Sequence, residues 1–327
     1  MIRRRRTAIA ALAAALFLGH PGAVLAQDAF PRQALRLVVP FPPGGLTDVL
    51  GRAVAERLGK ALGQIVVVEN KPGAGTMLGA EQVAKSAPDG HTLLMTTSTT
   101  FGIAPALYKN PPIDPVRDFQ PVSLIGTVNF FLIGSPAFAP RSLGEMISQI
   151  KASPGKYNYA SVGNGTAHHL FMEDFKRRLG LEIAHVPYKG TPAALVDLIP
   201  GKVHIMFADA AVAVPQIQGG KLIAYATSAA NQNQLLPAVP PIARTVPGFD
   251  WQAWQGVSVP AATPPAVVAR LSAEMQKFQH TAEFREFLAK IGMEPWAPIT
   301  PAEFSAMVKR ELPVWAEAVL AAGAKLD

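Results

Sequence analysis

Short runs of β-branched and aliphatic residues alternate along this chain with stretches in which apolar residues recur about every four positions. The runs 35–39 and 65–68 are typical of buried strands. Between them, leucine and valine recur every four residues over 50–62, which predicts an amphipathic helix that ends at Gly63. Two strands that flank one helix indicate a right-handed crossover and a parallel sheet.

The alternation continues to about residue 226, without an internal repeat or a low-complexity linker. It predicts an α/β fold throughout this part of the chain. The sequence Ser142-Leu143-Gly144-Glu145 has the pattern of a capping box, which predicts where one of the helices begins. We expect further strands at 91–96, 122–133, 157–160, 183–186, 203–207 and 222–226, and helices near 76–86, 142–151, 167–179, 192–199 and 211–218.

The C-terminal part has a different character. Residues 229–248 form a connection rich in proline, asparagine and glutamine, and the aromatic strand 251–259 follows it. Two helices are predicted to begin at Thr263 and Thr300, because each threonine precedes a proline that suits the first helical position.

The first residues have the pattern of a secretory signal peptide. Four arginines at 3–6 precede an apolar run over 8–18, and Val24-Leu25-Ala26 provides the small and branched residues of a signal-peptidase site. The apolar run is shorter than the roughly 17–25 residues that span a bilayer, which disfavours a membrane anchor. We therefore expect export to the periplasm with cleavage after Ala26.

A helical tail after two α/β blocks suggests that the chain crosses into a second lobe near Leu124 and returns near Ala253. We therefore predict a two-lobed α/β protein in which a ligand cleft lies between the lobes. The predicted domains are a signal peptide at 1–26, lobe 1 at 27–123 and 253–327, and lobe 2 at 124–252.

Charge and composition narrow the class of protein. Residues 1–26 contain four arginines and no acidic residue, so the formal charge falls from +7 to +3 without them. No nucleic-acid partner is expected, because no later run of lysine and arginine resembles a basic patch that would contact the phosphate backbone of a nucleic acid. The chain has no cysteine, which excludes thiol nucleophiles and cysteine metal sites. We expect a monomer with no metal and no cofactor.

The first candidate site is the loop 40–48, between a predicted strand and the helix after it. Two prolines constrain the chain, two glycines allow tight turns, and a threonine or an aspartate can cap the helix. Free N–H groups at a helix start bind anions, and in open α/β sheets ligands bind at such strand ends. An ordinary strand-to-helix turn remains an alternative. The candidate residues are Phe41, Pro43, Gly44, Gly45, Thr47 and Asp48.

The second candidate loop, 161–169, also lies between a strand and a helix and is small and polar. A serine hydrolase would require glycine where Tyr159 stands in the nucleophile elbow. The adjacent histidines His168 and His169 could suggest a metal site, but neighbouring residues on a helix point about 100° apart. Both interpretations are therefore disfavoured.

Three further segments follow strands. Residues 186–191 contain Tyr188, whose side chain could form an amphipathic wall of a ligand site. They also contain Lys189, which could supply a positive charge to the ligand or simply be exposed to solvent at the rim of the loop. The five hydroxyl residues at 96–100 favour a polar ligand wall. Residues 70–79 have a Gly-x-Gly spacing, but they lack the dinucleotide pattern and the Walker lysine, so a structural turn is expected.

Taken in order, these segments resemble the Bug family, the extracytoplasmic receptors of tripartite tricarboxylate transporters. The resemblance runs from about Pro31 to Asp327. The motifs that carry it are Phe41-Pro42-Pro43-Gly44-Gly45-x-x-Asp48, Val68-Glu69-Asn70-Lys71-Pro72-Gly73-Ala74-Gly75, Ala87-Pro88-Asp89-Gly90-His91-Thr92-Leu93-Leu94, Pro105-Ala106-Leu107-Tyr108, Asn158-Tyr159-Ala160-Ser161-x-Gly163-Asn164-Gly165 and His185-Val186-Pro187-Tyr188-Lys189-Gly190.

The resemblance implies a Venus-flytrap fold with a hinged cleft and a small carboxylate held by backbone amides and ordered waters. It also implies delivery of that ligand to the membrane subunits of the transporter. The residues that it implies for one side of the cleft are Phe41, Gly44, Gly45, Thr47, Asp48, Thr97, Ser98 and Thr99. Those for the other side are Ser161, Gly163, Gly165, Thr166, His169 and Tyr188.

Two positions depart from the family pattern. Where the family usually has an acidic residue and then a polar one, this chain has Ala208 and then Asp209, which we include among the ligand-binding candidates. A common Pro-Asn pair is replaced by Asn129-Phe130, so the ends of the pocket are expected to be more apolar than usual. The alternatives are a receptor used for sensing and a secreted hydrolase that uses Ser161 or Ser98.

Overall fold

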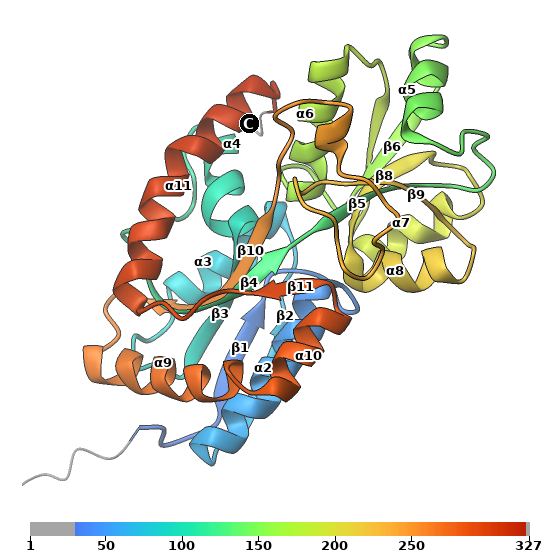
Figure 1. The fold of residues 1–327 in the computed structure, drawn as a ribbon. Coiled ribbons are helices and arrows are strands. Elements are labelled where there is room, and N and C mark those ends of the chain that lie inside the picture. The colour runs from blue at the N-terminus through green and yellow to red at the C-terminus, as the bar shows by residue number, and fades with distance from the viewer. Residues whose placement is uncertain (1–29, 325–327) are drawn as a thin grey trace, which may run out of the picture. The chain divides into compact units, whose positions relative to one another are not determined.

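A computed structural model describes residues 30–324, and the predicted signal peptide lies outside the described residues. Two mixed sheets organise the chain (Figure 1). The first has the order β11 (Met293–Pro295), β4 (Phe119–Val128), β10 (Ala253–Pro260), β3 (Thr92–Thr97), β1 (Leu35–Val39), β2 (Val66–Asn70). The second has the order β7 (Ala184–Pro187), β6 (Asn158–Ser161), β8 (Ile205–Asp209), β5 (Phe130–Gly134), β9 (Ile223–Thr227). We call the parts built on these sheets lobe 1 and lobe 2.

The predicted parallel unit at the start of lobe 1 is confirmed. Strands β1 and β2 pair in parallel, with Leu35 opposite Val66. Helix α2 (Leu46–Leu62) connects them and ends at Gly63, whose left-handed backbone closes the helix. The helix begins earlier than its apolar spacing suggests, because Gly45 and not Thr47 or Asp48 is the N-cap.

The predicted strand 122–133 is in fact two strands in different sheets. Strand β4 pairs with β10 and β11 in lobe 1 as far as Val128, whereas β5 begins at Phe130 and pairs with β8 and β9 in lobe 2. Asn129 lies between them, and its amide Nδ2 donates to Glu294 Oε1 at 2.9 Å. The passage from green β4 to β5 is visible in Figure 1. The lobe boundaries at Leu124 and Ala253 stay predictions.

The predicted helices are present, and the start of α9, like that of α2, differs from its prediction. Thr300 and Glu303 form a complete capping box at α11, whereas at α5 only the Ser142 half forms, because Glu145 accepts from the Arg141 backbone instead. Helix α9 starts after Pro264, since Thr263 donates its hydroxyl proton to the Pro260 carbonyl. The helices are α3 (Met77–Ala84), α4 (Ala104–Leu107), α5 (Leu143–Lys151), α6 (Ala167–Leu179), α7 (Thr191–Leu198), α8 (Ala210–Gln218), α9 (Pro265–Gln279), α10 (Ala282–Lys290) and α11 (Pro301–Ala321).

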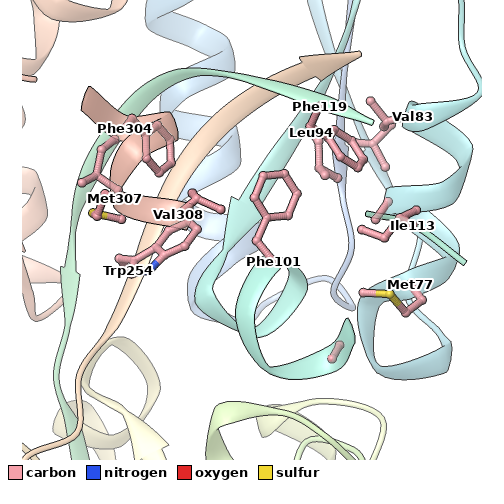
Figure 2. Close-up of a cluster of buried hydrophobic side chains, with 14 residues drawn as sticks. Met77, Val83, Leu94, Phe101, Ile113, Phe119, Trp254, Phe304, Met307 and Val308 are labelled. Carbon is pink, nitrogen blue, oxygen red and sulfur yellow. The ribbon is translucent and has the colours of Figure 1, made fainter. Parts of the chain in front are cut away.

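Each sheet has a hydrophobic core of its own. In lobe 1, Phe101 lies between the side chains of β3, β4 and β10 and those of α3 and α11 (Figure 2). Its ring contacts Phe119 and Trp254, with centroids 5.0 and 6.5 Å away. A second cluster fills lobe 2 around Phe131 and Met206. None of the helices in the described part of the chain is both long and apolar enough to cross a membrane.

Candidate functional site

A cavity of about 50 Å³ lies between the two lobes, and we call it the inter-lobe cavity. Lobe 1 lines it with the loop before α2, with the Thr97–Thr99 segment after β3, and with the start of β10. Lobe 2 lines it with Phe130 and with the loops that lead into α6, α7 and α8. A volume of this size has room for a few water molecules.

Four helices begin at this cavity without a side-chain cap. Helices α2, α6, α7 and α8 have Gly45, Thr166, Gly190 and Asp209 as their N-caps, and none of these side chains accepts a hydrogen bond from its own helix. The first N–H groups of a helix have no partner within the helix, and the positive end of the helix dipole lies there. The cavity wall therefore favours a negatively charged or hydrogen-bond-accepting group.

Hydrogen-bonding side-chain atoms without a partner gather around the same cavity. Within residues 30–324, the buried atoms Ser98 Oγ, Gln255 Oε1, Asp209 Oδ1 and both ring nitrogens of His168 have no hydrogen-bond partner, and all four residues line the inter-lobe cavity. Leaving such groups unpaired in a buried place costs free energy. This concentration indicates a site that is completed by a polar ligand.

The lobes touch each other around the cavity. The Ala167 backbone N–H of lobe 2 donates to Thr99 Oγ1 of lobe 1 at 3.2 Å. A Cβ placed on Gly190 would lie 3.2 Å from Pro42 Cγ, so the two loops approach closely because this residue is glycine. The two lobes are therefore in direct contact beside the cavity.

Asp48 organises the loop before α2 and does not line either of the cavities described here. Its carboxylate accepts from the Gly44 backbone, from Arg52 and from Asn70, whose amide also donates to the Phe41 carbonyl. Burial alone would raise the pKa of Asp48, but the hydrogen bonds and the Arg52 charge outweigh it and lower this pKa below its usual value. The structure therefore gives Asp48 contacts within the loop, and its role in ligand binding stays a prediction.

A second, larger cavity of about 560 Å³ adjoins the first, and we call it the outer cavity. Phe41, Pro42 and Val162 line both cavities. Tyr188 lies in the outer cavity, where its hydroxyl donates to Asp197 at 3.0 Å, and Lys189 is exposed at the rim. The two cavities therefore share part of their walls.

Ser161 and His169 lie behind the cavity wall in a stack of three rings. The rings of Tyr159, His185 and His169 follow one another with centroid separations of 4.8 and 4.2 Å. Ser161 Oγ lies 2.6 Å from His185 Nε2, and His169 Nδ1 accepts from the Gly165 backbone. The structure thus places a base beside Ser161, which the sequence pattern did not show, but this serine is fully buried and lines neither cavity.

Acidification is expected to destabilise the protein through this stack. Burial, and for His185 also the charge of His169, lowers the pKa values of His169 and His185, the latter from 6.5 to about 4. Glu173 and Lys176 face the same rings and act on these pKa values in opposite directions. The folded state binds protons at these rings less readily than the unfolded state does. The contribution of the stack to the free energy of unfolding is therefore fully present above pH 6.5 and is lost as the pH falls toward 4. We expect a loss of about 1–2 kcal/mol, after allowance for solvent screening of a half-buried ring.

Urea denaturation at pH 7.5 and pH 4.5 measures this loss. The variant His185→Phe keeps a flat ring in the stack and should lose about half of the pH dependence, whereas His280→Gln, at an exposed position, should keep all of it. Equal pH dependence in His185→Phe and the wild type would show that the stack is not responsible.

The structure brings some of the predicted site residues together and separates others. Seven line the inter-lobe cavity: Phe41, Gly45, Thr47, Thr97, Ser98, Thr99 and Asp209. Gly163, Thr166 and Tyr188 line the outer cavity with Phe41. Six line neither cavity: Pro43, Gly44, Asp48, Ser161, Gly165 and His169.

Sequence reasoning missed three polar residues of the inter-lobe cavity. His168, and not His169, faces the cavity, where its Nε2 lies 3.8 Å from Asp209 Oδ2. Thr191 donates to the same Asp209 oxygen at 3.3 Å, and Gln255 donates to Thr47 at 3.0 Å. Helix phase could have distinguished the two histidines, whereas Gln255 on β10 carried no local signal. In the described chain, no cluster of three or more His, Asp or Glu side chains could hold a metal ion.

Two α/β lobes with a cavity between them, whose largely apolar wall carries a few polar groups, define a two-lobed binding protein. Comparisons with known proteins support this class and identify its family. Residues 50–316 match the family described as the tripartite tricarboxylate transporter family receptor, and the chain belongs to that family. Its members are periplasmic binding proteins that serve a transporter.

Individual relatives agree over almost the whole chain. BugT of Bordetella pertussis is 35% identical over 315 residues, which are 95% of this chain and 96% of BugT. Among solved structures, R. palustris Rpa4515 with adipate is 32% identical, with a TM-score of 0.88 over 91% of this chain and 100% of that one. MatC from Rhodopseudomonas palustris with bound malate is 34% identical, with a TM-score of 0.84 over 89% and 100%.

These findings confirm the resemblance to the Bug family and the predicted two-lobed fold. Family membership makes the protein a solute-binding receptor and not an enzyme, so the hydrolase alternative is set aside.

Proposed function

We propose that this receptor captures a small organic carboxylate in the inter-lobe cavity and delivers it to the membrane subunits of a tripartite tricarboxylate-type transporter. The observation that carries the proposal is that Ser98 Oγ and the His168 ring, which can donate hydrogen bonds to a carboxylate, are buried at that cavity without a partner. Adipate in Rpa4515 and malate in MatC support the carboxylate class.

The surroundings of the cavity suit an anion that is held without a lysine or an arginine. Among the described residues, no basic side chain other than His168 lines the inter-lobe cavity. The donors there are the hydroxyls of Thr47, Thr97 and Ser98 and the N–H groups at the helix starts. A few well-placed donors in a largely apolar pocket confer specificity, and closure of the lobes is a hinge motion.

The remaining parts of the proposal concern the state of the protein. We propose that the chain is exported, cleaved after Ala26, and active in the periplasm as a monomer that requires no cofactor. The residues that we assign to the ligand are those of the inter-lobe cavity, and the outer cavity provides the entrance.

Native mass spectrometry of the purified protein tests the proposal, followed by denaturation to identify any released compound. We expect a one-to-one adduct whose mass is that of an organic acid. If the protein carries no adduct, a thermal-shift panel of mono-, di- and tricarboxylates should raise the melting temperature for at least one acid. No adduct and no response to any acid in the panel would contradict carboxylate capture.

A further inference from the structure

Asp209 presents an incompletely paired carboxylate to the lobe 2 side of the inter-lobe cavity. It ends strand β8 and caps α8, and only 4% of its surface is exposed. One oxygen, Oδ2, accepts from Thr191 at 3.3 Å, and the other, Oδ1, has no partner within residues 30–324. A carboxylate accepts hydrogen bonds and cannot donate them, so Oδ1 requires a donor.

The protein itself offers little compensation for this charge. His168 Nε2 is 3.8 Å from Oδ2, beyond hydrogen-bonding distance, and both of its ring nitrogens lack a hydrogen-bond partner. Asp209 already provides the negative charge that the starts of α7 and α8 favour. A second carboxylate at this end would therefore be repelled by Asp209 and would leave Oδ1 unpaired.

The lobe 1 side of the cavity offers hydroxyl donors to a carboxylate, beside one unpaired acceptor, Gln255 Oε1. Thr47, Thr97, Ser98 and the uncapped start of α2 are available there, and no acidic side chain of lobe 1 lines the cavity within the described residues. Phe41, Phe130 and Trp254 supply apolar surface. The ligand that fits has one carboxylate, an apolar middle and a hydrogen-bond donor at its far end.

We propose that this receptor prefers a monocarboxylate whose far end carries a hydroxyl or an ammonium group, and that Asp209 selects it against a dicarboxylate of the same length. This inference rests on the proposed function, because it assumes that the inter-lobe cavity holds the carboxylate. It predicts a different ligand from those that the adipate and malate complexes of the related structures contain.

Isothermal titration calorimetry at pH 7.5 with two matched ligand sets tests the proposal. The four-carbon set is succinate, 4-hydroxybutyrate, 4-aminobutyrate and butyrate, and the six-carbon set is adipate, 6-hydroxyhexanoate, 6-aminohexanoate and hexanoate. In at least one set, the hydroxy or the amino acid should bind at least about tenfold more tightly than the diacid. Comparison of these two acids shows which donor is preferred.

The variant Asp209→Asn removes the charge and supplies an amide donor. It should reverse the ranking, with the diacid gaining at least about tenfold in affinity. The matched control Asp250→Asn, at an exposed position shortly before β10, should keep the wild-type ranking. Because the wild-type ranking is itself a test, the proposal can be judged even if Asp209→Asn does not fold.

The outcomes separate this inference from the proposed function. A wild-type protein that binds the diacid most tightly, or a folded Asp209→Asn protein with an unchanged ranking, would overturn the role of Asp209 and leave carboxylate capture standing. No binding of any ligand in either set, together with no response in the broader acid panel, would overturn both.

Discussion

Replacing Gly45 with valine is expected to weaken ligand binding roughly a hundredfold, equivalent to about 2.7 kcal/mol, while the protein stays folded. Gly45 lines the inter-lobe cavity and is the N-cap of α2. Its backbone is extended, with φ −86° and ψ 172°, a conformation that valine readily adopts. A Cβ built on Gly45 meets no atom within 4 Å, so the backbone position itself accepts a branched residue.

The added side chain instead weakens the binding of the ligand. The cavity has a volume of about 50 Å³, and three carbon atoms beside the start of α2 occupy part of that space. They also separate the first N–H groups of the helix from an approaching carboxylate, which glycine allows to come close to the backbone. Calorimetry with the tightest-binding acid of the panel measures the loss.

Gly144→Val is the matched control for this substitution. Gly144 lies in the first turn of α5 in lobe 2, and a Cβ there also meets nothing within 4 Å. We expect this control to keep the wild-type affinity. Unchanged affinity in a folded Gly45→Val protein would mean that the ligand does not approach the start of α2.

Much of the fold could be predicted from local patterns in the sequence. A strand bounded by turn residues can be recognised from a window of about ten residues, as at β1. The same holds for a helix with an apolar residue every four positions, as at α2. The division of 122–133 could not be predicted in this way, because both halves are apolar. What separates β4 from β5 is the sheet in which each one pairs, and that depends on strands more than 70 residues away, such as β8.

Two elements that were not predicted, β11 and α10, differ in how much local signal they carry. Strand β11 has three residues, too few for a period to be visible. Helix α10 does have apolar residues four apart, Phe284 and Leu288, and both are buried, so its pattern was present in the sequence.

The candidate site was predictable as a set of loops and less so as a set of side chains. Strand-to-helix loops with glycine and hydroxyl residues do surround the inter-lobe cavity. Which side chain of each loop faces the cavity depends on tertiary packing. At α6 the helix phase was an available signal, because His168 lies on the same face as the buried Phe171 and Phe175, whereas His169, about 100° away, stacks on His185.

Replacing Phe101 with alanine is expected to lower the free energy of unfolding by about 3–5 kcal/mol, because deletion of a buried ring loses transfer free energy and leaves a cavity. Phe101 is fully buried at the centre of the lobe 1 core (Figure 2). It belongs to a π-helical turn, Thr99–Ile103, whose first residue is one of the hydroxyl residues of the site. Its ring contacts Trp254, which itself lines the inter-lobe cavity. Loss of the ring should therefore affect the core and the cavity wall together.

Urea denaturation followed by circular dichroism measures the stability change, and calorimetry with the tightest-binding acid measures the effect on the site. Val314→Ala on α11 is the control, since that side chain is 55% exposed and its truncation should change stability by no more than about 0.5 kcal/mol. At a temperature where Phe101→Ala is still folded, we expect weaker binding, because Thr99 and Trp254 both lose their support. A loss of stability with unchanged affinity would show that the core of lobe 1 and the binding site are independent. A loss below about 1 kcal/mol would show that neighbouring side chains fill the space left by the ring.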